Sequence, residues 1–596
     1  MKKSFFLFMT FLSVSVIATM TACGDDDPAD EPHKPVNPVD TTATDTTGHN
    51  PVNPVVSDAG WPANYGGVML QAFYWDGYAD AQWSRLESQV ENLATTFDLV
   101  WIPQSANCGG QSMGYDDLYW FDNYNSSFGT ESELRSMIQT FKQHGIGTIA
   151  DVVINHRKNV SNWVDFPKET YNGVTYQLQS TDICGNDDDG ATKQWATQNG
   201  YQLSANSDTG EGWGGMRDLD HKSQNVQDNV KAYLKMLLND FGYVGFRYDM
   251  VKGYSGQYTK MYNEDAKPQF SVGECWDGTN TIKNWIEATG KTSAAFDFQF
   301  RYTVRNAANN SKWNSLGGQN DGNWPLVSNS YSNGDYRQYA VTFVENHDTE
   351  YRSATAQQDP LKKDTLAANA YLLAMPGTPC VFMKHWQAYK QDIANMVAVR
   401  KAVGITNTSV PTQIYSQQGY YAVQVKGSGN KMLLCVVGTN AASYTPDPVW
   451  QKVLSGYHYA YYVYGIDPAT ITLPQIKDDE PQQQDGDFAG IPSFCTVNAG
   501  ETCAFFEAPF SWGSQIYTWA WMSGGDGKDY LAISWPGVEA TLLGTADNGN
   551  RVFKWTATNT TAPDFIIFSG GGKQTGDLTF QQAGYYTKDG LQGTVK

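Results

Sequence analysis

The segment Gly245-Phe-Arg247-Tyr-Asp249 decides how this chain folds, because a short apolar run ends there in a polar residue. Such a run is typical of a buried parallel strand whose carboxyl end enters a loop. A single Asp in that position is more often a helix cap or a satisfied loop residue than a functional group. The segment therefore gains meaning only if other strands end in the same way.

Three further segments do end in the same way. They are Asp151-Val-Val-Ile-Asn155-His156, Gly273-Glu274-Cys-Trp276 and Phe343-Val-Glu-Asn-His347-Asp348. An α/β barrel places its chemistry at the carboxyl ends of its strands. The four segments together predict that three carboxylates, Asp249, Glu274 and Asp348, converge on one barrel mouth.

Eight apolar runs are expected to be the strands of this barrel, with helical patterns between them such as Glu131 to His144, after the cap-like Thr130, and Asn225 to Phe241. The eight runs are Val68 to Trp75, Leu99 to Pro103, Gly147 to Ile154, Val244 to Asp249, Phe270 to Glu274, Ala294 to Phe298, Ala340 to Val344 and Cys380 to Met383. This alternation predicts an α/β fold, a (β/α)8 TIM barrel over residues 59–404.

The connection after the third strand is too long for one helix, so residues 157–222 are predicted to form an inserted subdomain over the barrel mouth. Short alternating strands follow the barrel and predict an antiparallel all-β domain over residues 405–470. A polar stretch marks residues 471–505 as a linker or irregular segment. Residues 506–596 form a further β-rich unit.

The composition favours a neutral polymer as partner. A net charge of −21, with no dense Lys/Arg stretch, argues against nucleic-acid binding. The chain has 19 Trp and 35 Tyr, and aromatic rings stack on sugar faces, although most of these rings are expected to be core.

The amino terminus has the pattern of a signal peptide at residues 1–22, because its apolar run is too short to cross a membrane. The small residues before Cys23 resemble a bacterial lipoprotein cleavage site, which implies a lipid on Cys23 and a membrane anchor; ordinary secretion with cleavage nearby is the alternative. Residues 23–58 are polar and predicted to be a flexible tether.

The location of the anchored chain is predicted to be the outer membrane or the cell surface, because the run Asp25-Asp-Asp27 resembles surface-export signals of some lipoproteins. An early Asp favours inner-membrane retention in other bacteria, so the leaflet stays open. Seven cysteines remain if Cys23 is lipidated, and an odd number spread this widely does not indicate a framework of disulfides. Cys495 and Cys503 are nevertheless close enough in sequence to form one bridge.

The residues of these motifs and their order along the chain resemble those of the α-amylase family of glycoside hydrolases, family 13, and its plant-type members most closely. Further matching segments are Gln71-Ala-Phe-Tyr-Trp75, Asp208-Thr-Gly210, Asp218-Leu-Asp-His221 and Gly377-Thr-Pro-Cys380. The resemblance implies retaining cleavage of α-glucans, namely starch and maltooligosaccharides. It also implies that Asp249 is the nucleophile, Glu274 the acid/base and Asp348 the stabiliser of the transition state.

The same resemblance implies residues that contact the sugar. His156 and His347 match two histidines that hydrogen-bond the sugar beside the cleaved bond, and Tyr115 matches an aromatic platform under it. Lys252 and Trp276 match contacts on the leaving-group side, for which a surface charge and structural packing are the alternatives.

Two charged residues complete the predicted site. Arg247 lies two residues before Asp249, so both point to the same side of the strand and the cation keeps Asp249 ionised. The resemblance implies that Asp151 supports this group by hydrogen bonding to Arg247 and does not react.

A structural calcium ion is also implied by the resemblance, and hard cations prefer oxygen ligands. Asn155, Asp218 and the backbone carbonyl of Gly253 match its ligands. The acidic run with Asp187 and Asp188 resembles additional ligands of the plant enzymes, with a solvated loop as the alternative. The pattern for a second ion is incomplete, because Gly212 stands where those enzymes carry a ligand Asp; compensation by Glu211 beside it is the alternative.

The carboxyl-terminal unit contains Gln515-Ile-Tyr517-Thr-Trp519-Ala-Trp521, whose alternation places three rings on one strand face. Together with Ser534-Trp535-Pro-Gly537, this unit resembles starch-binding modules of carbohydrate-binding family 26, which implies a β-sandwich. Trp519 and Trp535 are the expected glucan contacts, with Lys573 and Gln574 as hydrogen-bonding candidates.

The sequence thus predicts a monomeric, calcium-dependent, endo-acting α-amylase, exported as a lipoprotein with its own starch-binding module. A maltogenic amylase, a transglycosylase or a debranching enzyme of the same clan is an alternative, because outer subsites set such specificity. A non-catalytic starch-capture lipoprotein is another, and the presence of all three carboxylates weighs against it.

Overall fold

The computed structural model describes residues 60–212, 214–329, 334–353, 355–477, 490–509, 512–513, 515–525, 527–546, 550–559, 561–571 and 573–595. The predicted signal peptide, Cys23 and the whole of the tether lie outside the described residues, as does most of the polar stretch 477–486. Among the helices that are described, none is both long enough and apolar enough to cross a membrane.

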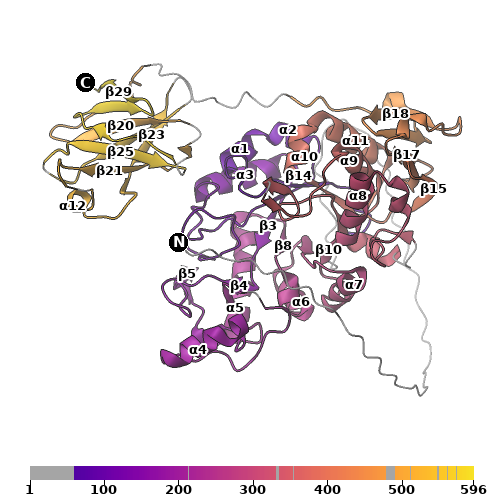
Figure 1. The fold of residues 1–596 in the computed structure, drawn as a ribbon, viewed down its shortest axis with the longest axis horizontal. Helices are drawn as coiled ribbons and strands as arrows, with labels where there is room; N and C mark the ends of the chain where they lie inside the picture. Colours follow the sequence, from indigo (N-terminus) through magenta and orange to yellow (C-terminus); the bar gives the residue numbers. More distant parts are fainter. Residues whose placement is uncertain are drawn as a thin grey trace, which may run out of the picture. The chain divides into compact units, whose positions relative to one another are not determined.

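Eight parallel strands close into a barrel (Figure 1). In pairing order they are β1 (Met69–Gln71), β14 (Thr378–Phe382), β11 (Ala340–Thr342), β10 (Ala294–Phe296), β9 (Phe270–Gly273), β8 (Gly245–Tyr248), β3 (Gly147–Val152) and β2 (Leu99–Ile102), which pairs again with β1. All eight predicted strands form, and the predicted barrel is confirmed.

Each strand ends earlier than predicted. The clearest case is Asp297, whose Oδ1 accepts a hydrogen bond of 3.0 Å from the Phe300 backbone N–H. That bond caps the helix that follows. Strand β10 therefore stops at Phe296, and Phe298 is helical instead of extended.

The helix α3 (Glu131–Gln143) begins where its sequence predicts. Thr130 Oγ1 accepts from the Glu133 backbone N–H at 3.3 Å, and Glu133 Oε2 accepts from the Thr130 N–H at 2.8 Å. This capping box satisfies two backbone donors of the first turn. Further helices are α1 (Trp83–Ser88), α2 (Val90–Ala94), α4 (Ala191–Gln198), α5 (Gln224–Met236), α6 (Gly256–Ala266), α7 (Thr279–Ala288), α8 (Phe298–Asn310), α9 (Thr365–Ala374), α10 (Met383–Ala388), α11 (Lys390–Val403) and α12 (Gly527–Leu531).

The long connection between β3 and β8 carries short elements besides α4 and α5. They are β4 (His156–Arg157), paired with β7 (Arg217–Asp218), and the hairpin of β5 (Glu169–Tyr171) and β6 (Val174–Tyr176). The pairing sets His156 opposite Asp218. Residues 62 positions apart in sequence are thereby brought next to the end of β3.

The domain after the barrel is a five-stranded antiparallel sheet in the order β15 (Pro411–Gln417), β16 (Tyr420–Lys426), β17 (Met432–Val437), β19 (Tyr459–Tyr464) and β18 (Gln451–Gly456). Helices α9 and α11 pack against β17 (Figure 1). Leu433, Cys435 and Val437 from this strand belong to the same hydrophobic core as the barrel. The sheet and the barrel therefore share one core.

The carboxyl-terminal residues form two sheets that face each other across their own core, which includes Phe506, Trp555, Phe568 and Tyr586. One sheet has the order β23 (Thr541–Thr545), β24 (Arg551–Thr556), β20 (Cys503–Ala508), β28 (Gly584–Thr587) and β29 (Gly590–Thr594). The other has β22 (Val538–Glu539), β21 (Tyr517–Trp521), β25 (Phe565–Gly570) and β26 (Lys573–Gln574), with β27 (Leu578–Thr579) also paired with β25.

Two expectations for this region need correction. Strand β20 begins at Cys503, so residues 503–505 belong to the sandwich and not to the linker. The seven cysteines in the described part of the chain are all free and buried, so the considered bridge between Cys495 and Cys503 is not formed. Both thiols pack in an apolar cluster with Phe505, Val552 and Tyr585.

Candidate active site

One buried guanidinium organises the barrel mouth. Arg247 lies on β8, and its Nη1 is 2.6 Å from Asp249 Oδ1 and 2.9 Å from Asp151 Oδ1. Its Nη2 is 3.0 Å from Glu274 Oε2, just after β9. The strand ends thus bring these three carboxyl groups around one cation, which is 1% exposed.

Glu274 is held by one of its oxygens. Its Oε2 contacts Arg247 Nη2 and also accepts a 3.1 Å hydrogen bond from the Met250 backbone N–H. Met250 adopts φ = 42°, a left-handed conformation that is costly for this residue type. Because Oε2 holds both contacts, Oε1 is the oxygen left to carry a proton.

The surroundings of Glu274 favour its protonated form. Burial raises the pKa of Glu274 well above its ordinary value; Arg247 lowers it, and Asp249 and Asp348 raise it again through their negative charges. A carboxyl group kept protonated near neutral pH is suited to donate a proton.

Asp348 follows β11 and is bound on both oxygens. Arg352 Nη2 lies 3.2 Å from Oδ1, and His347 Nε2 lies 3.1 Å from Oδ2. Burial raises the pKa of Asp348, whereas the cations of Arg247 and Arg352 lower it. Asp348 remains more open than the others, with 28% of its side chain exposed, which suits a group that reaches a ligand.

Asp151 has no oxygen left for chemistry. Its Oδ1 accepts from Arg247, and its Oδ2 accepts from Trp101 Nε1 at 3.1 Å and from Tyr115 Oη at 3.0 Å. Burial raises the pKa of Asp151 to about 6, an effect that Arg247 opposes. This arrangement fits the supporting role expected of Asp151.

A row of rings forms one wall of the site. Tyr115 is parallel to His347, at 5.3 Å and 10°, and to Trp75, at 6.1 Å and 1°. Gln71 Nε2 is 2.8 Å from His347 Nδ1, and His347 Nε2 is 2.7 Å from Tyr115 Oη. Burial lowers the pKa of His347 well below its ordinary value, so this imidazole is neutral at neutral pH.

The other predicted sugar contacts occupy three different settings. His156 is buried, with Nε2 3.2 Å from the Tyr115 carbonyl. Lys252 is paired with Glu211 at 2.8 Å and with Asp277 at 2.9 Å, so its charge is balanced within the protein. Trp276 is 36% exposed and stacks on Phe298 at 4.9 Å. Their sugar contacts stay predictions.

The residues expected to hold calcium form a cluster of oxygens beside β3. A Cβ added to Gly253 would lie 1.8 Å from Asn155 Oδ1, which means that the two are in close approach. A Cβ on Gly212 would lie 3.3 Å from Asp218 Oδ2 and 3.6 Å from Asp208 Oδ2. Asp208 was not predicted as a ligand, yet its carboxylate converges with that of Asp218.

The cluster fits a hard cation. Asp208 Oδ2 is buried without a hydrogen-bond partner, and burial raises the pKa of Asp208. Two adjacent carboxylates repel unless a proton or a cation lies between them. In the described part of the chain no three His, Cys, Asp or Glu side chains form a metal-binding group, so amide and carbonyl oxygens would have to complete this one.

The acidic run lies beside this cluster but has other partners. Asp187 Oδ1 accepts from the Asp218 N–H at 2.8 Å, and Oδ2 accepts from Arg217 at 2.6 Å. Asp187 thus positions Asp218 through the backbone. A Cβ on Gly214 would be 3.4 Å from Asp188 Oδ1. Direct calcium contacts of Asp187 and Asp188 stay predictions.

The sandwich presents aromatic rings on its outer face. Along β21, Tyr517, Trp519 and Trp521 are half-buried and alternate with buried neighbours, as the sequence predicts. Trp535 is 48% exposed and meets Trp519 at 5.7 Å with an angle of 69° between the rings. Lys573 and Gln574 are exposed on β26. Glucan contacts of these residues stay predictions.

Sequence reasoning missed three participants. Arg352 lies 4.0 Å over the Trp75 ring and donates to the His347 carbonyl at 2.6 Å, so it joins the aromatic wall to Asp348. Met250 contributes only its backbone N–H, a group that every residue except proline carries, so the residue type could not have pointed to it. Asp208 lies in the matching segment Asp208-Thr-Gly210, and its place in that segment was the one sign that could have pointed to it as a calcium ligand.

Comparisons with known proteins agree with this geometry. The family model described as "Alpha amylase, catalytic domain" matches residues 97–401. The Arabidopsis thaliana protein named Probable alpha-amylase 2 is 30% identical over 414 residues, which cover 66% of this chain and 93% of that protein. A glucan 1,4-alpha-maltotetraohydrolase of Roseateles saccharophilus is 27% identical over 420 residues, covering 64% and 69%.

Solved structures are also similar. One is an alpha-amylase from Malbranchea cinnamomea, with a TM-score of 0.46 and 17% identity, covering 67% of this chain and 94% of that one. The family model spans more than half of the sequence, and the Arabidopsis relative is matched over nearly its whole length. The chain belongs to the alpha-amylase family of glycoside hydrolases.

Proposed function

We propose that the chain hydrolyses internal α-1,4-glucosidic bonds of starch and maltooligosaccharides with retention of the anomeric configuration. The observation that carries this proposal is the guanidinium of Arg247, whose two terminal nitrogens contact Asp249 and Glu274. Neighbouring nitrogens keep the two carboxyl groups close together. Retaining glycosidases use a close pair, whereas inverting enzymes need room between the carboxyl groups for a water molecule.

The proposed first step uses both carboxyl groups. Glu274 Oε1 gives its proton to the glycosidic oxygen, and the leaving chain departs as an alcohol. Asp249 attacks the anomeric carbon through Oδ2, because Oδ1 is engaged by Arg247, and forms a glycosyl ester. In the second step Glu274, now ionised, takes a proton from water, and the resulting hydroxide displaces Asp249.

The surrounding residues hold the sugar through these steps. Asp348 accepts hydrogen bonds from sugar hydroxyls, and its ties to His347 and Arg352 fix its orientation. Tyr115 and Trp75 offer ring faces, while His156 and His347 stay neutral and line the site without adding positive charge. Trp276 and Lys252 are proposed to meet the leaving-group side.

One calcium ion is proposed to bind through Asn155, Asp208, Asp218 and the Gly253 carbonyl. When bound, the ion supplies charge compensation for the two carboxylates and ties the long β3–β8 connection to the segment after β8. The partnerless Asp208 oxygen supports this ligand set.

The ends of the chain add proposals about location and substrate capture. The signal-like segment and Cys23 support export as a lipoprotein to the outer membrane or cell surface. The exposed rings around Trp519 and Trp535 support starch binding by the sandwich, as in family 26 modules. Growth with labelled palmitate should label the wild type and leave Cys23→Ala unlabelled.

A product profile tests the proposed activity. On amylose, endo action should give a fast fall in iodine staining with mixed short products. Release of maltose alone or of maltotetraose alone, or cleavage of pullulan, would contradict endo-amylase action. Glu274→Gln measured on the same substrates should lose the activity, and an unchanged rate would overturn the assignment of the acid/base.

A further inference from the structure

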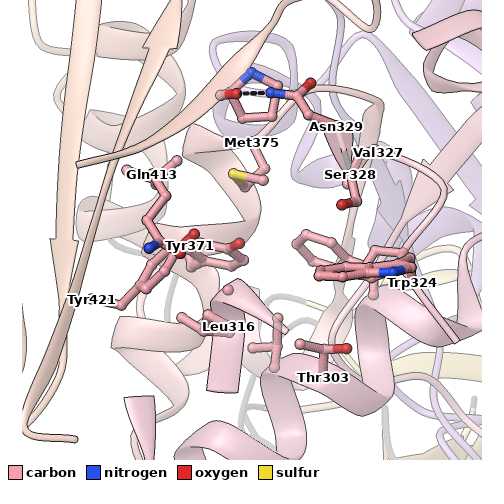
Figure 2. A pocket seen from close by; sticks show the side chains of 16 residues that line it. Thr303, Leu316, Trp324, Val327, Ser328, Asn329, Tyr371, Met375, Gln413 and Tyr421 are labelled. Carbon is pink, nitrogen blue, oxygen red and sulfur yellow. Dashed lines mark hydrogen bonds between the residues drawn. The ribbon is translucent and has the colours of Figure 1, made fainter. Parts of the chain in front are cut away.

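A cavity lies between the outer helices of the barrel and the antiparallel sheet that follows it (Figure 2). Its walls come from α8, the turn at residues 313–317, the segment 324–329, α9, β15 and β16. The space open to water-sized molecules is about 100 Å³. A water molecule needs roughly 10–15 Å³ by this measure, so the cavity holds a single small ring and not a chain.

The walls of the cavity are uncharged. None of its 16 lining residues is Asp, Glu, Lys, Arg or His, and none belongs to the catalytic group. Phosphates, carboxylates and cations would lose their hydration there without gaining a countercharge. The ligand that this lining accepts is neutral.

Two buried tyrosines present hydroxyls that the protein does not use. Tyr371 and Tyr421 are each 4% exposed, and their rings meet at 6.1 Å and 73°. Within the described residues no hydrogen bond engages either hydroxyl. Neither hydroxyl oxygen is among the fully buried atoms that lack a partner, so both open onto the cavity and can donate to or accept from an occupant.

The opposite wall adds a ring and further polar groups. Figure 2 shows Gln413, Tyr371 and Tyr421 on one side of the space, and Trp324 and Ser328 on the other. The amide of Gln413, which is exposed, and the indole N–H of Trp324 also have no hydrogen-bond partner among the described residues. Aromatic faces with hydroxyl, amide and indole groups around them match a molecule with apolar C–H faces and a rim of hydroxyls.

We propose that this cavity binds one glucosyl unit at the end of an α-glucan, outside the catalytic site. The proposal rests on the proposed function, since the chain meets neutral carbohydrate as its substrate. The barrel and the antiparallel sheet share one core, so a sugar bound between them is held at a fixed place relative to the catalytic mouth. The site would retain glucan ends while the barrel cuts elsewhere.

The first experiment is a crystal structure of the full chain with Glu274→Gln, soaked in maltose. The proposal expects a glucose ring in the cavity with polar contacts to the Tyr371 and Tyr421 hydroxyls. Sugar in the barrel mouth with water alone in the cavity would overturn the proposal and leave the proposed function intact. An empty barrel mouth in the same crystals, with no wild-type activity on amylose, would instead count against the function.

The second experiment measures maltose binding in solution by calorimetry, again with Glu274→Gln. Adding Tyr371→Phe and Tyr421→Phe removes two unpartnered hydroxyls and keeps both rings, so the fold should be retained. Each lost hydrogen bond should weaken maltose binding at this site about threefold to tenfold, so that the double substitution removes one site from the isotherm. Tyr420→Phe is the matched control, because its ring packs in a separate cluster.

The outcome is decided by the difference between the two variants. Loss of one site only in the double variant supports the proposal. Identical isotherms for the double variant and Tyr420→Phe would overturn it, even if crystals at high maltose concentration show sugar in the cavity.

Discussion

The barrel mouth and the outer face of the carboxyl-terminal sandwich are both expected to meet α-glucan, but they are built differently. At the mouth, Arg247 is 1% exposed and joins Asp151, Asp249 and Glu274, so every charge has a fixed partner. On the sandwich, Trp535 is 48% exposed, and its ring packs mainly on Trp519. Bond cleavage needs charges that are held in fixed positions, whereas binding of a glucan needs only exposed ring faces on which the sugar can stack.

The largest expected effect separates cleavage from capture. Glu274→Gln should reduce kcat on soluble starch by about 10²–10⁴-fold, because the proton donor is lost. Adsorption to starch granules should remain at the wild-type level, because the sandwich is untouched. Glu264→Gln, an exposed carboxyl on α6 that pairs only with Lys260, is the control and should keep its rate. Equal losses of rate and adsorption in Glu274→Gln would show that the two regions are not independent.

Removal of calcium should affect the barrel and spare the sandwich. A chelator should lower the Tm of the barrel transition by several degrees, because Asp208 and Asp218 then repel each other. Asp208→Asn should lower the starting Tm less than the chelator does, and it should abolish most of the chelator's effect. Calorimetry measures both transitions. A chelator effect that persists unchanged in Asp208→Asn would place the ion elsewhere.

The aromatic face should respond to loss of a ring. Trp535→Ala should weaken adsorption to starch granules by about tenfold, which corresponds to roughly 1.4 kcal/mol, and should leave kcat on soluble starch unchanged. A depletion assay on granules measures this effect. Met522→Ala, also an exposed apolar residue of the sandwich, is the control. Normal adsorption of Trp535→Ala would exclude this ring from capture.

The smallest expected effect tests how the mouth fixes Asp348. The Arg352 cation lowers the pKa of Asp348, so Arg352→Gln should raise that pKa and move the acid limb of the pH–rate profile to higher pH, by less than about one unit. KM should rise as well, because Arg352 also stacks on Trp75. Arg352→Lys should restore the limb but not KM. If the acid limb did not move in Arg352→Gln, the Arg352 cation would not be what lowers the pKa of Asp348.

The sequence predicted those parts of the molecule that follow from local pattern. The cap-like Thr130 predicted where α3 begins. Apolar runs predicted the eight strands, and the polar residues at the ends of four of them predicted the residues at the mouth. Alternation predicted the ring face of β21. In each case neighbouring residues along the chain determine the geometry.

The remaining features depend on contacts between distant segments, which pattern does not reveal. Arg352 reaches Asp348 and Trp75 from the hairpin of β12 (Tyr351–Ser353) and β13 (Ala356–Gln357). Lys252 forms an ion pair with Glu211. The Glu211 carboxylate is therefore already engaged and does not replace the calcium-ligand Asp that is missing at Gly212. Tyr371 and Tyr421 are 50 positions apart in sequence, so their cavity could be found only in three dimensions.

The central claim is that Asp249 attacks the sugar while Glu274 transfers the proton. The most direct measurement incubates the wild type and Glu274→Gln with a fluorinated maltosyl fluoride, whose good leaving group needs no acid, and locates the adduct by mass spectrometry of peptides. The account predicts a maltosyl ester on Asp249 in both proteins. An adduct on another carboxylate, or release of inverted product with no adduct, would contradict it.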